Sequence, residues 1–445
     1  MKFVKCIIFS LLALTGQQSG GITAAEIETD TVLIENVRVW DGNSNDVSEP
    51  TSVLVESGLI KTIGSQVGIG HNGTNINGNN RVLMPGIIEA HTHISMPMSE
   101  DKAIKEDPSY VTAHSIAIAE GILMRGWTTI RDMGGPSQGI AKAIDEGIVP
   151  GPRIYTAAMF ISQTSGHGDS RYLTQGHPNM GATQNSFMPR RVIIADGPDE
   201  VMRAVRESLR VGATAIKVMA GGGISSDYDP LDSVQYTFEE MRAAVIAAEQ
   251  WNTYVAVHAY TDEAVVNALN AGVKVIEHGH LLSKETLRLI KKKGAYLSTQ
   301  SFGFFNNGSI DTSTNRGKKA QMVFDGIDKL MKNAKELEMQ VAFGTDSFGL
   351  PSIFANAPKE FGYRLKWFNS LEILKQATSF NAKLLELTGP RNPYVAGPLG
   401  VIEEGAYADL LIVDGNPLND IRLLEDYENN IKLIMKNGVV YKNTL

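Results

Sequence analysis

Amphipathic segments that end at a glycine alternate with short apolar runs through the middle of the chain. The patterns over 199–211 and 262–271 end at Gly212 and Gly272, and a β-branched run that predicts a strand follows each of them. Further helices are expected at 111–125, 237–251, 284–293 and 319–337. With the apolar run before His91, eight strands alternate with helices, which indicates βα units and the number of strands that closes a barrel.

The two ends of the chain have a different pattern, in which apolar and polar residues alternate between Gly and Asn turns. This alternation occurs near the N-terminus in "VLIENVRVW" and "SVLVESGLIKTIG", and it returns near the C-terminus in "IKLIMKNGVVYKN". Neither end has enough strands to bury a core alone, so we expect one small β-sandwich built from both. The predicted fold class is therefore α/β, a (β/α)8 TIM-like barrel with a small β-sandwich domain formed by both chain ends. The expected division is 1–25 signal peptide, 26–84 and 393–445 β-sandwich, and 85–392 barrel.

The first residues have the pattern of a secretory signal peptide. Lys2 and Lys5 precede a short apolar core over 6–14, and small residues up to Ala25 offer a cleavage site. The apolar core is too short for a comfortable membrane span, although a retained anchor is the alternative. We expect secretion, into a bacterial periplasm, and no membrane span after signal cleavage. Cys6 is the only cysteine, so the mature chain would hold a metal through nitrogen and oxygen alone.

Composition excludes some classes of partner. The chain has 445 residues, 43% of them hydrophobic and 20% charged, with a formal net charge of -8, as expected for a soluble globular protein. Its one lysine triplet, 291–293, ends a predicted helix, where cations favour the helix dipole. Nothing therefore supports nucleic-acid binding. A homo-oligomer is left open.

Ionisable residues stand at the C-terminal ends of the predicted barrel strands, where barrels of this kind build their active sites. His91 and His93 end strand one, and their side chains point the same way because they are two residues apart. The others are Lys217 on strand four, His258 on strand five, His278 on strand six and Asp346 on strand eight. Each alone could be structural, but all six in barrel order predict a metal site.

Lys217 is an unusual residue for such a place. Two dications would repel an ammonium, and burial would add to the effect, so the neutral amine is favoured. A neutral amine can add carbon dioxide to give a carbamate, which could bridge two metals. A lysine in a salt bridge is the alternative.

From about residue 31 to the end, the chain resembles the amidohydrolase superfamily, and more closely its Xaa-Pro dipeptidase and imidazolonepropionase-related branch. The motifs that carry the resemblance are "PGIIEAHTH", "GATAIKVMAGGG", "VAVHAY", "IEHGH", "GTDS" and "GAYADLLIVDGNP". The resemblance implies a (β/α)8 barrel, a β-sandwich from both termini, and two divalent metal ions, which we expect to be Zn²⁺.

Carried over by position, the resemblance assigns the six residues to two metals. His91, His93 and Asp346 would bind the more buried ion, His258 and His278 the second, and N6-carboxylysine at Lys217 would bridge them. A metal-bridging hydroxide would attack an amide carbonyl. Asp346 would accept its proton and pass that proton to the leaving amine.

Two further residues are expected to meet the substrate. His167, in "SQTSGHGD" after strand three, resembles a family Gly-His-Gly segment and would act on the substrate carbonyl or carboxylate. Tyr228 follows Lys217 in a glycine-rich loop and would also contact substrate. For His167 a plain loop residue is the alternative, and His280 is expected behind the ligands. Glycines 221–223 lack the lysine and hydroxyl of a phosphate loop, so they predict close backbone approach.

The expected function is therefore a metal-dependent hydrolase that cleaves an amide bond in small peptides or N-acyl amino acids, as a dipeptidase or carboxypeptidase does. Within enzymes, the alternative is hydrolysis of a cyclic amide or an aromatic amide, including toxins. A non-catalytic extracytoplasmic binding protein is the alternative from another class. Asp346 argues against that class, because binding alone does not require a proton acceptor.

Overall fold

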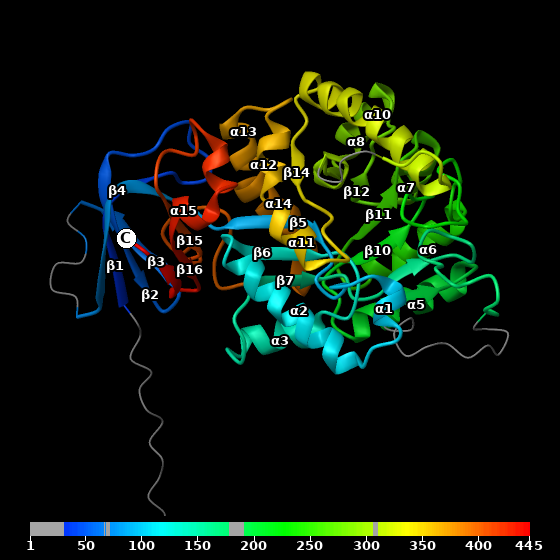
Figure 1. The fold of residues 1–445 in the computed structure, drawn as a ribbon, viewed down its shortest axis with the longest axis horizontal. Coiled ribbons are helices and arrows are strands. Elements are labelled where there is room, and N and C mark those ends of the chain that lie inside the picture. Colours follow the sequence, from blue (N-terminus) through cyan, green and yellow to red (C-terminus); the bar gives the residue numbers. More distant parts are fainter. Residues whose placement is uncertain (1–30, 66, 68–71, 178–190, 306–309) are drawn as a thin grey trace, which may run out of the picture.

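The computed structural model describes residues 31–65, 67, 72–177, 191–305 and 310–445. The expected signal peptide at 1–25 lies outside the described residues. Figure 1 shows a strand-rich part that contains both the first and the last strands, beside a larger part in which helices surround parallel strands. Among the described residues, no helix combines the length and the apolar character needed to cross a bilayer.

The larger part is built from parallel strands in two hydrogen-bonded sheets, each of which is called a ladder below. One ladder has the order β5-β6-β7 and the other the order β14-β13-β12-β11-β10-β8-β9. The strands are β5 (Ile87–Thr92), β6 (Trp127–Asp132), β7 (Arg153–Thr156), β8 (Phe160–Ser162), β9 (Val192–Ile194), β10 (Ile216–Met219), β11 (Val255–Ala259), β12 (Val275–His278), β13 (Tyr296–Thr299) and β14 (Val341–Phe343). The predicted third strand is divided into β7 and β8 by 157–159, where Ala158 has a φ of 55°.

Hydrogen bonds outside the ladders join the two sets of strands. The Thr214 N–H donates to the Thr156 carbonyl at 2.7 Å, which ties β7 to the start of β10. On the other side, Asp346 N–H donates to the His91 carbonyl at 2.7 Å, and His93 N–H donates to the Ser347 carbonyl at 3.0 Å. Eight strand positions thus form the barrel, with β7 and β8 sharing the third and β9 as an additional strand beside β8, and the predicted fold class is confirmed.

Helices follow the strands as the amphipathic pattern predicts. Those in the predicted places are α2 (Pro108–Leu123), α5 (Pro198–Arg210), α6 (Phe238–Glu249), α7 (Asp262–Ala271), α8 (Lys284–Lys293) and α10 (Asn315–Glu336). Additional helices include α1 (Glu100–Ala103), α3 (Gln138–Asp145), α11 (Pro351–Asn356), α12 (Lys359–Arg364), α13 (Ser370–Lys375) and α14 (Asn381–Leu385). Helix α10 begins before the expected Lys319 because the Thr314 side chain caps it by accepting from the Gly317 N–H.

The strand-rich part is a seven-stranded mixed sheet that uses both ends of the chain. Its order is β17 (Val439–Asn443), β16 (Ile431–Lys436), β15 (Leu410–Val413), β4 (Thr74–Pro85), β1 (Thr31–Val39), β2 (Pro50–Glu56) and β3 (Leu59–Gly64). The edge strand β3 is bonded to the segment that leads into β15, since Ile60 N–H donates to the Ala406 carbonyl and Gly405 N–H donates to the Ile60 carbonyl, both at 2.8 Å. The enclosed core takes Ile34 and Val53 from one end and Leu433 from the other.

Candidate active site

The structure brings the six predicted ligand residues together at the C-terminal ends of the barrel strands. Oδ1 of Asp346 lies 3.2 Å from His93 Nε2 and 3.4 Å from His91 Nε2. The ring of His278 lies between the rings of His91 and His258, with centroids 5.1 and 4.5 Å away. Lys217 is fully buried on β10, two residues before Met219, which pairs with His258 on β11.

Unusual backbone conformations accompany two of these residues. His278 has a φ of 69° and Asp346 a φ of 51°, in the left-handed region that non-glycine residues seldom occupy. Such a conformation costs on the order of 1–3 kcal/mol and persists only where surrounding contacts fix it. For Asp346, the hydrogen bond from its N–H to the His91 carbonyl supplies one such contact. The strain thus falls at the strand ends that face the cluster.

Three of the four imidazoles have one ring nitrogen hydrogen-bonded to a protein oxygen. His91 Nδ1 donates to Glu277 at 2.8 Å, His93 Nδ1 to the Gly134 carbonyl at 3.1 Å, and His258 Nε2 to the Gly222 carbonyl at 3.2 Å. This pattern fixes the tautomer and leaves the other nitrogen for a metal.

Two further observations bear on whether these side chains could bind a metal ion. They are the surroundings of the fourth imidazole, His278, and a buried ring nitrogen of His91. The amide nitrogen of Gln300 lies against His278 Nδ1, while Gln300 Oε1 has no hydrogen-bond partner within the described residues. With the amide turned over, Oε1 would accept from Nδ1, and Nε2 of His278 would be left to bind a metal. Within the described residues, His91 Nε2 is buried without a hydrogen-bond partner. His91, His93 and Asp346 each offer a ligand atom within 4.8 Å of the others. This donor set suits a divalent metal ion.

The electrostatics of the cluster favour the ligand forms of these side chains. Burial, together with the charge of Lys217, lowers the pKa of His91 to about 4. Burial and neighbouring cationic groups also hold the pKa values of His258 and His278 well below the usual range. Burial alone would raise the pKa of Asp346, but His91 and His93 outweigh it, and the pKa is lowered. The lowered pKa values favour the neutral form of His91, His258 and His278 and the ionised form of the Asp346 carboxylate.

Lys217 has a weakened affinity for its proton. Burial lowers the pKa of its amine to about 8, although Glu277 and Asp346 act in the opposite direction. An amine with this pKa has an appreciable neutral fraction near neutral pH, and the neutral form is the one that adds carbon dioxide.

Sequence reasoning missed the buried ion pair that supports this cluster. The guanidinium of Arg131, on β6, donates to Glu277 Oε1 at 2.7 Å, and Glu277 Oε2 accepts from His91. Burial would raise the pKa of Glu277, but the charge of Arg131 followed by that of His91 lowers it. The sequence did contain a signal: Arg131 and Glu277 each lie within an apolar run that predicts a strand. A charged side chain buried in this way needs a partner.

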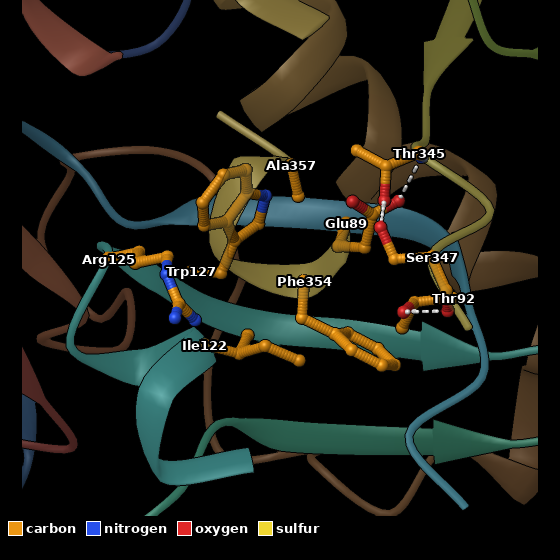
Figure 2. Close-up of a pocket in the computed structure, with 9 residues that line it drawn as sticks. All are labelled: Glu89, Thr92, Ile122, Arg125, Trp127, Thr345, Ser347, Phe354 and Ala357. Carbon is orange, nitrogen blue, oxygen red and sulfur yellow. Dashed lines mark hydrogen bonds between the residues drawn. The ribbon is translucent and has the colours of Figure 1, made fainter. Parts of the chain in front are cut away.

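Glu89 is a second carboxylate that was missed, and it connects the first and last barrel strands. Its Oε1 accepts from the His91 N–H at 3.0 Å and from the Thr345 N–H at 2.8 Å. Figure 2 shows Glu89, Thr345 and Ser347 on one side of a small cavity, with Trp127 and the aromatic ring of Phe354 also lining it. None of the six predicted ligands lines this cavity, so it is distinct from the cluster.

His167 joins the cluster, as its place after strand three predicts. Its ring stacks on that of His258, with centroids 4.1 Å apart and an angle of 15° between the planes. Tyr228 is half-exposed, and within the described residues no hydrogen bond or ring contact joins it to the cluster. His280 is buried, and its Nε2 donates to the Gln300 carbonyl at 2.7 Å, behind His278.

The glycine-rich loop after β10 approaches its neighbours closely, as its sequence predicts. A Cβ on Gly223 would lie 2.0 Å from the His167 ring, and one on Gly222 would lie 1.8 Å from the Pro230 carbonyl oxygen. Gly221 has more room, since its nearest neighbour would be 3.4 Å away. Two of the three glycines are therefore required by contacts beside the site.

Comparisons with known proteins agree with this geometry. A sequence model of the amidohydrolase family matches residues 82–441. Ochratoxinase of Aspergillus niger is 31% identical over 376 residues, which cover 81% of this chain and 76% of that protein. A crystal structure of a prolidase complexed with N-methylphosphonate-L-proline is 29% identical, with a TM-score of 0.85 over 93% of this chain and 100% of that one. A Xaa-Pro dipeptidase with bound methionine in its active site is 29% identical, with a TM-score of 0.80 and the same coverage.

The matched span contains every residue of the cluster, from His91 on the first barrel strand to Asp346 after the last. Both the family match and the ochratoxinase relative extend over most of the chain. The protein is therefore a hydrolase, and it belongs to the amidohydrolase family.

Proposed function

We propose that the protein cleaves an amide bond in small peptides or N-acyl amino acids and that it uses two divalent metal ions to do so. The observation that carries the proposal is the single cluster of four imidazoles and one carboxylate around the buried Lys217. The similarity to a prolidase and to a Xaa-Pro dipeptidase supports a peptide substrate.

The resemblance assigns the residues that would hold the metals, and the grouping of His91, His93 and Asp346 supports that assignment. His91, His93 and Asp346 would bind one ion, and His258 and His278 would bind the other. Lys217, as N6-carboxylysine, would bridge them. Nitrogen and oxygen ligands without cysteine are compatible with Zn²⁺. Two such ions, when bound, lower the pKa of a water molecule and polarise a carbonyl group.

Asp346 is the group that we assign to proton transfer. Its side chain is 24% exposed, whereas that of His91 beside it is 1% exposed, so the carboxylate is the part of this pair that a substrate can reach. The lowered pKa of Asp346 keeps it ready to accept a proton from the attacking water. It would then pass that proton to the leaving nitrogen.

His167 and Tyr228 are assigned to substrate. His167 is held beside the cluster, where its ring could contact the substrate carbonyl or a free carboxylate. Tyr228 lies in the loop after β10 with a half-exposed ring, from which its hydroxyl could donate to the same carboxylate. We therefore expect substrates with a free C-terminal carboxylate.

Hydrolysis of a cyclic or aromatic amide is the second candidate function. Ochratoxinase, at 31% identity, is the observation that favours it. A non-catalytic binding protein is set aside, because the family and the relatives named above are hydrolases.

The proposals on location and organisation rest on sequence alone. Residues 1–25 would be a signal peptide that directs the chain to a bacterial periplasm. The barrel would cover 85–392, with one sandwich domain from 26–84 and 393–445. A homo-oligomer is left open.

The test is turnover of a substrate panel by zinc-loaded protein. The panel pairs dipeptides and N-acyl amino acids with their C-terminal amides, and it includes cyclic and aromatic amides. The proposal predicts hydrolysis of the free carboxylates, with amidation costing about 1.5–3 kcal/mol, the usual value of a hydrogen bond to a charged group. Equal kcat/KM for a dipeptide and its amide would remove carboxylate recognition and favour the second candidate.

A further inference from the structure

We propose that Asp229 is a positioning residue, which holds the His167 ring against His258 and so determines how His167 meets the substrate carboxylate. The inference rests on the proposed function, since His167 acts in it only if a substrate binds there. It assigns a role to a buried acid in the loop after β10.

Asp229 is almost fully buried, and its carboxylate points at the group that it would position. Its Oδ2 accepts from the Gly223 N–H at 2.7 Å and lies 3.4 Å from His167 Nδ1. The same Nδ1 lies 2.7 Å from the Ser226 hydroxyl. A buried carboxylate is costly unless it is paired, so a position of this kind needs a reason.

The loop after β10 holds His167 by its backbone as well as by its ring. The His167 N–H donates to Gln235 Oε1 at 2.9 Å. Gly223 leaves room for the ring, because a Cβ there would lie 2.0 Å from it. One face of the ring also stacks on His258. His167 is therefore fixed in several directions at once, and Asp229 provides the charged contact.

The loop is in turn anchored to helix α10. The ammonium of Lys319 donates to the Ser226 carbonyl at 2.6 Å and to the Asp229 carbonyl at 3.0 Å. Its nitrogen also lies 3.9 Å from Asp229 Oδ1. The position of the carboxylate thus depends on a partly buried lysine on a long helix and not only on the loop itself.

This arrangement leaves Nε2 as the atom with which His167 can meet a ligand. Nδ1 is occupied by Ser226 and Asp229, whereas the Ser225 hydroxyl lies 3.5 Å from Nε2, at the long limit for a hydrogen bond. A substrate carboxylate can replace a contact of that length. Loss of Asp229 would free the ring to turn, and the defined direction of Nε2 would be lost.

The same loop offers a matched control two residues away. Asp227 forms a two-point ion pair with Arg316, at 2.6 and 2.7 Å, but both side chains are more than half exposed. Exposed pairs contribute little to stability. Asp227→Asn therefore changes the same type of residue in the same loop without touching His167.

The experiment measures kcat, KM and bound zinc for Asp229→Asn, Asp227→Asn and the unchanged protein, with a dipeptide and its C-terminal amide. Asp229→Asn should raise KM for the free carboxylate about tenfold or more, as loss of a charge-assisted contact predicts. Its KM for the amide and its zinc content should stay close to those of the unchanged protein. Asp227→Asn should match the unchanged protein throughout. If Asp229→Asn does not fold, a Lys319→Met variant serves in its place, because it leaves Asp229 in the chain. It should show the same change in KM to a smaller degree.

A second readout separates this inference from the proposed function. Spectra of protein labelled with ¹⁵N-histidine, assigned with His167→Gln, report the hydrogen bond at His167 Nδ1 without any substrate. Asp229→Asn should shift that signal, and Asp227→Asn should leave it unchanged. If the unchanged protein hydrolyses none of the panel, the proposed function fails while this signal still tests Asp229. Equal signals and equal KM values in the two variants would overturn the inference.

Discussion

The Glu277 carboxylate accepts a hydrogen bond from His91 Nδ1 at 2.8 Å, and this contact leaves Nε2 of the same ring 3.4 Å from Asp346. Arg131 donates to the other oxygen of Glu277, so a fully buried ion pair orients the first of the proposed ligands. A residue behind a metal ligand can therefore control metal affinity without touching the metal.

Glu277→Gln should weaken zinc binding about 10–100-fold, because an amide cannot accept from both Arg131 and His91 with the strength of a carboxylate. Competition with a chelator measures the change. Glu360→Gln is the control, since Glu360 forms another fully buried ion pair, with Arg364, and within the described residues no hydrogen bond or ion pair joins it to a proposed ligand. Both variants should lose stability, but only Glu277→Gln should lose zinc. Equal zinc affinity in the two would contradict the role of Glu277.

Lys217→Ala should lose most of its bound metal and its activity, because the proposed bridging carbamate is removed. A short carboxylic acid at high concentration should restore part of the rate by taking its place. Lys436→Met is the matched control, since Lys436 is also buried and burial also lowers its pKa to about 8. That lysine donates to the Gly151 carbonyl, away from the proposed ligands. Full metal content and normal turnover in Lys217→Ala would remove the bridge from the account.

Asp346→Asn should keep the fold and lose about 10²–10⁴-fold in kcat, the contribution expected of a positioned acid–base group. The change is small in volume, and the backbone hydrogen bond from residue 346 to the His91 carbonyl does not depend on the side chain. Steady-state kinetics together with bound zinc would separate lost proton transfer from lost metal. A near-normal kcat would mean that another group carries the proton.

Gly223→Ala should impair turnover, because its Cβ would lie 2.0 Å from the His167 ring and one of the two must move. Overpacking of this kind costs about 1–3 kcal/mol of stability. Gly221→Ala, where the nearest atom would be 3.4 Å away, should be close to the unchanged protein. Kinetics and thermal unfolding of both variants measure the difference. If Gly223→Ala behaved like Gly221→Ala, His167 would not be confined as the structure describes.

Much of this molecule could be predicted from its sequence because the signals are local. Apolar runs between amphipathic segments gave the barrel strands, and the polar residue that ends each run gave the cluster from His91 to Asp346. The position of a residue at a strand end is a local property, and closure of the barrel then brings distant strand ends together.

What was missed depends on pairs of residues far apart in the chain. Arg131 and Glu277 meet across the barrel interior, and Asp229 meets His167 between two loops. Nothing near either residue of such a pair identifies the other. The interruption of the third strand at Ala158 was missed for a different reason, since alanine seldom adopts the left-handed conformation that the structure gives it.

The most direct test of the central claim is the rate of dipeptide hydrolysis as zinc is added back to metal-free protein. Two-metal amide hydrolysis predicts almost no turnover without metal, and a rate that rises until about two ions are bound per chain. Lys217→Ala should not reach that rate at the same zinc concentration. Full turnover by the metal-free protein, or no hydrolysis of any free-carboxylate amide with two ions bound, would contradict the account.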